Sequence, residues 1–290
     1  MDMKEGIVLL LGRPNVGKST FVNNVIGQKV SITSPKPQTT RMPVQGLYEE
    51  ERGKIIFTDT AGIFDKTKDA MAKKINTQTL QEVNKEADVV LYFIDPTRRR
   101  DFEEAKVLGI ARKMKSPIVL VINKSDKTQK YWPQYKFFED EFADRFHISA
   151  LKAHGFEPLL DRLFEMLPDA GSESFIEAER VYPLMNMDSK AFIGELIREK
   201  VFIMMGEEVP YSTTAVVDEI KERDNGILYI KARILTTNDR HKMMLIGKEA
   251  RKIKEIGSYA RKEIALATSK KVFLDLTVET DPHWQEVFYS

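Results

Sequence analysis

One octapeptide constrains the fold of this chain more than any other segment. Residues Gly12–Ser19 read Gly-Arg-Pro-Asn-Val-Gly-Lys-Ser, a complete match to the pattern G-x-x-x-x-G-K-[ST]. The octapeptide follows the apolar run Ile7–Leu11 and opens a segment of helical character. Glycines let backbone N–H groups converge on phosphate oxygens, and the N-terminus of the following helix adds its dipole. The octapeptide therefore predicts a strand, a phosphate-binding loop and a helix, in that order.

Further apolar runs follow at regular distances and alternate with segments long enough for helices. Because the runs are continuous rather than alternating, they indicate strands that are covered on both faces, as in a parallel sheet. This pattern predicts a doubly wound α/β domain of the P-loop class, in which ligands bind at the carboxyl ends of the strands. The expected strands are Ile7–Leu11, Lys54–Asp59, Val89–Ile94, Ile118–Ile122 and, more weakly, Phe146–Ser149.

The ends of the first two expected strands carry the residue types that a phosphate and metal site needs. Lys18 is expected to reach the β- and γ-phosphates, and the Ser19 hydroxyl to bind Mg²⁺. Asp59 begins the sequence Asp-Thr-Ala-Gly and is placed to hold the metal through water. Gly62 ends that sequence, and its N–H could contact a γ-phosphate. Metal ligation is therefore assigned to Ser19, Asp59 and Thr40, the last of which would close the shell only when the γ-phosphate is present.

A second set of residues predicts that the base is guanine. Asn123-Lys124-Ser125-Asp126 follows the expected strand Ile118–Ile122. The Asp126 carboxylate can accept hydrogen bonds from N1–H and the 2-amino group of guanine, whereas adenine would leave it charged and unpaired. Asn123 would brace the loops, the Lys124 stem would lie across the base, and the Ala150 N–H would meet guanine O6. The predicted nucleotide contacts are Gly12, Arg13, Pro14, Asn15, Val16, Gly17, Lys18, Ser19, Thr20, Asp59, Thr60, Ala61, Gly62, Asn123, Lys124, Asp126, Ser149, Ala150 and Leu151.

The pattern of elements changes after Leu167–Pro168, where a small and polar stretch begins. We divide the chain into a nucleotide-binding domain (1–168), a linker (169–180) and a second domain (181–290). The second domain is expected to hold a helix near Lys190–Met205, two strands, two helical pieces flanking Gly247, and a last strand. The expected strands are Thr214–Ile220, Ile227–Thr236 and Val272–Glu279.

These motifs, in this order, resemble GTPases of the translation-factor-like class. Gly12–Thr20 together with Ser31–Arg41 resembles the Era family of bacterial ribosome-assembly GTPases. Beyond the linker, Glu195–Lys200, Glu208–Ser212 and Ile253–Gly257 resemble the KH domain of that family, so the match covers nearly the whole chain. The resemblance implies GTP hydrolysis, an α+β type II KH fold (α-β-β-α-α-β), binding to the 3′ end of 16S ribosomal RNA, and a role in assembly of the 30S subunit.

The chain departs from the family pattern in its KH loop, where G-x-x-G is replaced by Gly247-Lys248-Glu249-Ala250. Ala61 replaces the usual proline, and the tail around Trp284 lacks the usual basic residues. The surrounding charge still favours RNA, since Arg240–Glu263 holds eight Lys or Arg residues against three acids. The predicted RNA contacts are Lys242, Gly247, Lys248, Arg251, Lys252, Lys254 and Arg261. One alternative is that this protein is a GTP-dependent switch for a protein or membrane partner, and that its own KH-like domain has lost RNA binding.

The position after Gly62 predicts slow hydrolysis. Ras-like GTPases orient the attacking water with a glutamine there, and this chain has Ile63. Related GTPases hold a potassium ion with the asparagine that corresponds to Asn15, although Asn15 is equally suited to a turn. Catalysis is assigned to Lys18, Thr40, Asp59, Gly62 and Asn15. A second alternative is a scaffold that binds GTP and barely hydrolyses it.

Composition places few limits on function. The 290 residues carry a net charge of +1, so any preference for nucleic acid has to be local. There is no cysteine and no apolar run of the ~20 residues that a membrane helix needs. We expect a cytoplasmic monomer that uses GTP/GDP and Mg²⁺, with potassium as a further ion and peripheral association with the inner face of the cell membrane as a further location.

Overall fold

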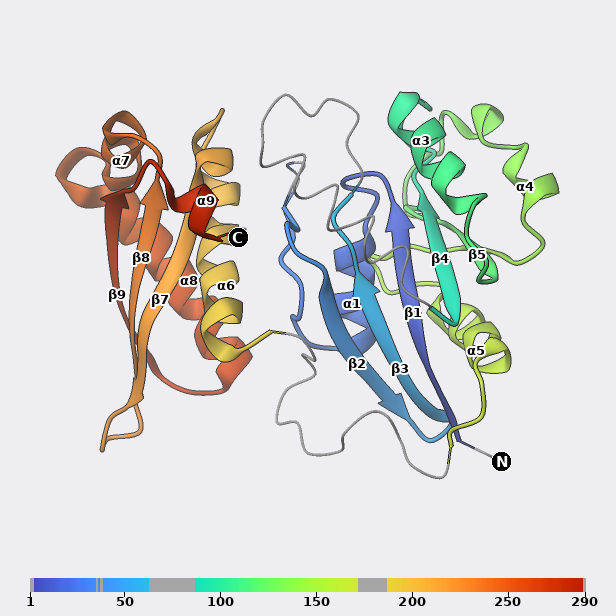
Figure 1. Cartoon of the computed structure of the whole chain (residues 1–290), viewed down its shortest axis with the longest axis horizontal. Coiled ribbons are helices and arrows are strands. Elements are labelled where there is room, and N and C mark those ends of the chain that lie inside the picture. The colour runs from blue at the N-terminus through green and yellow to red at the C-terminus, as the bar shows by residue number, and fades with distance from the viewer. Residues whose placement is uncertain (1–2, 35, 37–38, 63–86, 172–186, 289–290) are drawn as a thin grey trace. The chain divides into compact units, whose positions relative to one another are not determined.

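The computed structural model describes residues 3–34, 36, 39–62, 87–171 and 187–288 (Figure 1). The chain divides into two compact units. The first comprises residues 1–33 and 40–186, and the second comprises residues 34–39 and 187–290. Each unit has its own sheet. No helix in the described part of the chain has the length and apolar character to cross a bilayer.

The first unit is built on a six-stranded sheet in the order β2-β3-β1-β4-β5-β6. All neighbouring strands are parallel except β2, which pairs with β3 in the antiparallel direction. The elements are β1 (Lys4–Gly12), α1 (Lys18–Ile26), β2 (Val44–Glu50), β3 (Gly53–Asp59), β4 (Val89–Ile94), α3 (Phe102–Ala111), β5 (Ile118–Ile122), the 3-10 turn η1 (Trp132–Gln134), α4 (Phe138–Glu141), β6 (Arg145–His147) and α5 (Phe156–Met166).

Successive residues of β1 point to opposite faces of the sheet, and both faces are covered. Val8 and Leu10 pack with Phe21 of α1 and Leu163 of α5 on one face. Leu9, Leu11 and their neighbours pack with α3 and α4 on the other. Burial on both faces explains why the strands of the first unit read as continuous apolar runs.

The predicted α/β class is confirmed, with two differences in detail. The strand β2 was not predicted, because its half-exposed sequence Val-Gln-Gly-Leu-Tyr-Glu-Glu contains few apolar residues and lies at the sheet edge. The last strand is Arg145–His147 rather than Phe146–Ser149, and Ser149 lies in the loop beyond it.

The chain remains attached to the first sheet beyond Pro168. Asp169 forms a bridge with Lys4, and the Ala170 N–H donates to the Met3 carbonyl (2.6 Å). The predicted linker limits, 169–180, stay a prediction, because residues 172–186 lie outside the described part of the chain.

The second unit has the element order α-β-β-α-α-β that a type II KH fold requires. Its sheet has the order β7-β8-β9, with β7–β8 antiparallel and β8–β9 parallel, and α6 and α8 pack against it (Figure 1). Alternate residues Ile230, Ala232 and Ile234 of β8 are buried, and α8 buries Ile256, Ala260 and Ile264 at helical spacing. The elements are α6 (Ser189–Met204), η2 (Val209–Ser212), β7 (Thr213–Glu222), β8 (Leu228–Thr236), α7 (Asp239–Ile246), η3 (Lys248–Ala250), α8 (Arg251–Thr268), β9 (Val272–Thr280) and α9 (Trp284–Phe288).

Candidate nucleotide and nucleic-acid sites

The phosphate loop connects β1 to α1, as predicted, and Lys18 lies folded across it. The Lys18 ammonium donates to the carbonyls of Gly12 (3.2 Å) and Arg13 (3.3 Å). Burial lowers the pKa of Lys18 to about 8, an effect that the nearby Asp59 partly offsets. A polyphosphate would add negative charge beside this ammonium and favour its protonated form. The loop is therefore arranged to bind an anion of high charge.

Two glycines allow the phosphate loop to pack closely against the segments that contain Asn123 and Gly62. Gly17 has φ +104°, and a Cβ there would lie 2.2 Å from Nδ2 of Asn123. A Cβ on Gly62 would lie 2.4 Å from the Pro14 nitrogen. Larger residues at either position would push apart segments that have to act on one ligand.

The predicted metal ligands come together. The hydroxyl oxygens of Ser19 and Thr40 are 3.1 Å apart. The Asp59 carboxylate is fully buried, which raises its pKa against the lowering effect of Lys18. Its Oδ1 atom has no hydrogen-bond partner of standard geometry among the described residues. Two hydroxyl oxygens and a buried carboxylate fit Mg²⁺, which prefers hard oxygen ligands.

Asn123 joins the guanine loops to the phosphate loop. Its Nδ2 donates to the Val16 carbonyl (2.6 Å), and its Oδ1 accepts from the N–H groups of Lys124 (2.7 Å) and Ala150 (2.9 Å). The predicted bracing role of Asn123 agrees with these contacts. The Ala150 N–H, which was expected to meet guanine O6, donates to Asn123 Oδ1 in this structure. Base recognition at this position would require the N–H to be shared or exchanged.

Asp126 is exposed and ready to accept hydrogen bonds. The buried Ser149 hydroxyl donates to its Oδ1 (2.6 Å), and this hydrogen bond lowers the pKa of the Asp126 carboxyl. Lys124, with φ +63°, donates from its ammonium to the Asn15 carbonyl (3.0 Å) and pairs with Asp95 (2.5 Å). Sequence reasoning missed Asp95, although its place directly after β4 was a signal for it.

The Arg13 side chain does not lie among the predicted phosphate contacts. It is buried, with ion pairs to Glu104 (2.7 Å) and Asp101 (2.8 Å) and a hydrogen bond to the Tyr135 hydroxyl (2.7 Å). Burial also raises the pKa of Glu104, whose Oε1 accepts from the Tyr92 hydroxyl (2.5 Å). Only the backbone of Arg13 remains for a phosphate, and the side chain anchors the loop to α3.

The structure also places the other predicted contacts, whose roles stay predictions. The Thr60 hydroxyl donates to the Leu10 carbonyl (2.7 Å), and Ala61 is buried. Thr20 is in the first turn of α1, and Leu151 is largely exposed in the loop after β6. Asn15 has φ +60°, a left-handed conformation that asparagine tolerates. Ile63, on which the prediction of slow hydrolysis rests, lies outside the described residues.

In the second unit, the altered KH loop is strained. Glu249 (φ +54°) and Ala250 (φ +58°) both adopt the left-handed region, which favours glycine. Two of the predicted RNA contacts beside the loop are paired with acids. Arg251 pairs with Glu249 (2.9 Å) and Lys252 with Glu255 (3.0 Å).

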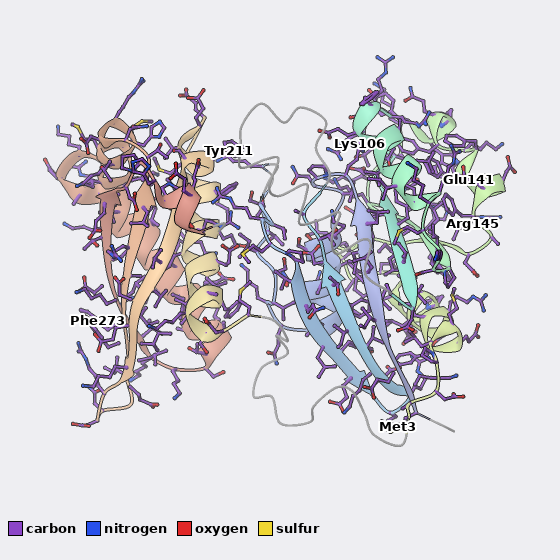
Figure 2. The ribbon with its side chains drawn as sticks, in the orientation of Figure 1. Met3, Lys106, Glu141, Arg145, Tyr211 and Phe273 are labelled. Carbon is purple, nitrogen blue, oxygen red and sulfur yellow. The ribbon has the colours of Figure 1, made fainter. Side chains whose placement is uncertain are left out.

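A cavity of about 310 Å³ lies between α8 and β9. Lys254 and Arg261, both predicted RNA contacts, are among its lining residues, which also include Ile253, Gly257, Ser258, Leu274 and Leu276. Phe273, one residue before Leu274 and labelled in Figure 2, is half exposed. It stacks on Tyr229 with ring centroids 5.9 Å apart. Because side chains alternate along a strand, Phe273 lies on the sheet face opposite to the cavity.

Comparison with known proteins identifies both units. Residues 7–124 match a family described as 50S ribosome-binding GTPase, and residues 208–285 match the KH domain family. The GTPase Era of Halothermothrix orenii is 36% identical in sequence to this chain, and the alignment covers 99% of this chain and 96% of the relative.

Two solved structures are similar over both units, each with 34% identity and a TM-score of 0.88. A variant of Aquifex aeolicus Era bound to GDP·AlF4⁻ is covered over 96% of its length, with 98% of this chain. Era in complex with MgGDPNP and nucleotides 1506–1542 of 16S ribosomal RNA is covered over 95% of its length, again with 98% of this chain. The chain belongs to the Era family of GTPases.

Proposed function

We propose that this protein binds GTP with Mg²⁺, hydrolyses it slowly to GDP, and binds the 3′ end of 16S ribosomal RNA during assembly of the 30S subunit. One observation carries the nucleotide half of the proposal. The Asn123 side chain bonds the phosphate loop at Val16 and the base loop at Ala150, so that one amide sets the spacing between phosphates and base. A guanine nucleotide has the phosphates and the base that these two loops would bind.

The RNA half rests on the cavity between α8 and β9. Apolar walls with two basic side chains suit a single strand, whose bases pack on apolar surface while its phosphates meet cations. Lys254 and Arg261 supply those cations. Arg251 and Lys252 are each held by a glutamate, and we expect them to contribute less than the sequence suggested.

The test is a titration of the full-length protein with a labelled RNA of nucleotides 1506–1542, in the presence of a GTP analogue or GDP. Charge reversal of both Lys254 and Arg261 to glutamate should weaken binding by at least about a hundredfold, or about 2.7 kcal/mol. The control is Lys221→Glu, an exposed reversal on β7 of the same unit. Binding should also weaken steeply with salt. Equal loss in the control, or no RNA binding by the parent protein, would favour the protein or membrane partner instead.

We further propose that potassium raises the hydrolysis rate through Asn15. The left-handed backbone of Asn15 supports the turn interpretation and is compatible with ion binding, so the variant must keep this backbone. Asn15→Gly keeps it and removes the side-chain oxygen. Replacing sodium by potassium should stimulate the parent protein and leave Asn15→Gly unchanged, with nucleotide affinity retained in both. A rate indifferent to the cation in the parent would refute the potassium role alone.

A further inference from the structure

Ser31 lies next to the metal site, and none of the predicted roles includes it. Its hydroxyl donates to Oδ2 of Asp59 (2.7 Å). Ser31 is 1% exposed and Asp59 is 0% exposed, so water does not compete for this hydrogen bond. With Oδ2 held in this way, Oδ1 is left for the metal site.

The Ser31 backbone is held from both sides by one side chain of α1. Asn23 Oδ1 accepts from the N–H groups of Val30 and Ser31 (2.9 Å each), and Asn23 Nδ2 donates to the Ser31 carbonyl (2.7 Å). These three hydrogen bonds from the Asn23 amide restrict the backbone at Ser31. The position of the Ser31 hydroxyl is therefore restricted as well.

Asn23 follows Ser19 by four residues on the same helix, so both side chains lie on one face of α1. The helix therefore places Ser19 directly and Asp59 indirectly, through Asn23 and Ser31. We propose that Ser31 is a positioning residue that fixes the Asp59 carboxylate for Mg²⁺, and that Asn23 fixes Ser31. This inference rests on the proposed Mg²⁺-dependent nucleotide binding.

The test measures release of fluorescent methylanthraniloyl-GDP from the full-length protein, in excess Mg²⁺ and in EDTA. Ser31→Ala should release the nucleotide about tenfold faster in Mg²⁺, which corresponds to about 1.4 kcal/mol, and at an unchanged rate in EDTA. Ser31→Thr, which keeps the hydroxyl, should restore slow release. Asn23→Ala should act in the same direction as Ser31→Ala, and it tests the anchor if Ser31→Ala does not fold.

The matched control is Ser116→Ala, which also removes a hydroxyl, here one that donates to the Ala87 carbonyl (2.6 Å). It should match the parent protein in both conditions. If Ser31→Ala retained the Mg²⁺ effect of the parent, or accelerated release equally in EDTA, Ser31 would be a structural residue and the inference would be wrong. If the parent itself showed no Mg²⁺ effect, the proposed function would fail as well, which is a distinguishable result.

Discussion

The strained loop before α8 leads to a stability prediction whose sign is opposite to that of an ordinary helix substitution. Ala250 has φ +58° and ψ +23° at the N-terminal end of α8, where its side chain makes no capping hydrogen bond. The left-handed region costs an L-residue about 1–2 kcal/mol, and glycine avoids that cost. Ala250→Gly should therefore remove strain from the folded second unit.

The expected gain is smaller than the strain, because glycine also gives the unfolded chain more freedom. That second effect destabilises the folded state by about 0.4–1 kcal/mol. The net change should be a stabilisation of about 0.5–1 kcal/mol. The control Ala267→Gly lies in the last turn of the same helix, at an ordinary helical backbone, and it should lose about 0.5–1 kcal/mol.

The assay is urea unfolding of the full-length protein followed by tryptophan fluorescence. Each unit has one tryptophan, so Trp132→Phe leaves only the buried Trp284 to report on the second unit. For a slope of about 1–2 kcal/mol per molar urea, Ala250→Gly should raise the midpoint by about 0.5 M. Destabilisation of the same size as in Ala267→Gly would refute the strain argument. The same variant should tighten RNA binding, because the loop backbone could then approach the phosphates more closely.

Three further predictions concern the first unit. Asp126→Asn should weaken GTP binding and favour xanthosine triphosphate, since the amide offers a donor to the 2-oxo group. Competition binding of the two nucleotides would measure the change. An unchanged preference for GTP would show that Asp126 does not recognise the base. Lys18, with a pKa of about 8 before nucleotide binds, should take up a proton on binding, because the phosphates raise that pKa. Affinity should then fall as the pH rises through 8, and calorimetry at pH 8.5 in buffers of different ionisation enthalpy would detect the uptake; identical heats after buffer correction would contradict it. Glu104→Gln should destabilise the first unit by about 1–3 kcal/mol, since the buried Arg13 loses its closest charge partner and keeps its ion pair with Asp101. Thermal unfolding would measure the loss, and an unchanged midpoint would contradict the role of this ion pair.

The sequence predicted the elements well where burial produces a clear pattern of apolar residues. The strands Val89–Ile94 and Ile118–Ile122 match β4 and β5, because both are buried on both faces. The edge strand Val44–Glu50 escaped prediction for the opposite reason, since its half-exposed residues carry no continuous apolar pattern. The order of three helices and three strands in the second unit was also predicted, and the expected elements follow one another as α6, β7, β8, α7, α8 and β9 do.

Pairings between distant side chains were harder to predict than the residues themselves. The motif named Arg13, yet its partners Asp101 and Glu104 lie about 90 residues away and follow no spacing rule. The same holds for Ser31, whose effect depends on Asn23 eight residues before it and Asp59 twenty-eight residues after it. A motif records which groups touch the ligand, because those groups are constrained by its chemistry. The groups that hold them are constrained only by folding, so the structure is needed to find them, as with Ser31 beside Asp59 and the acidic partners of Arg13.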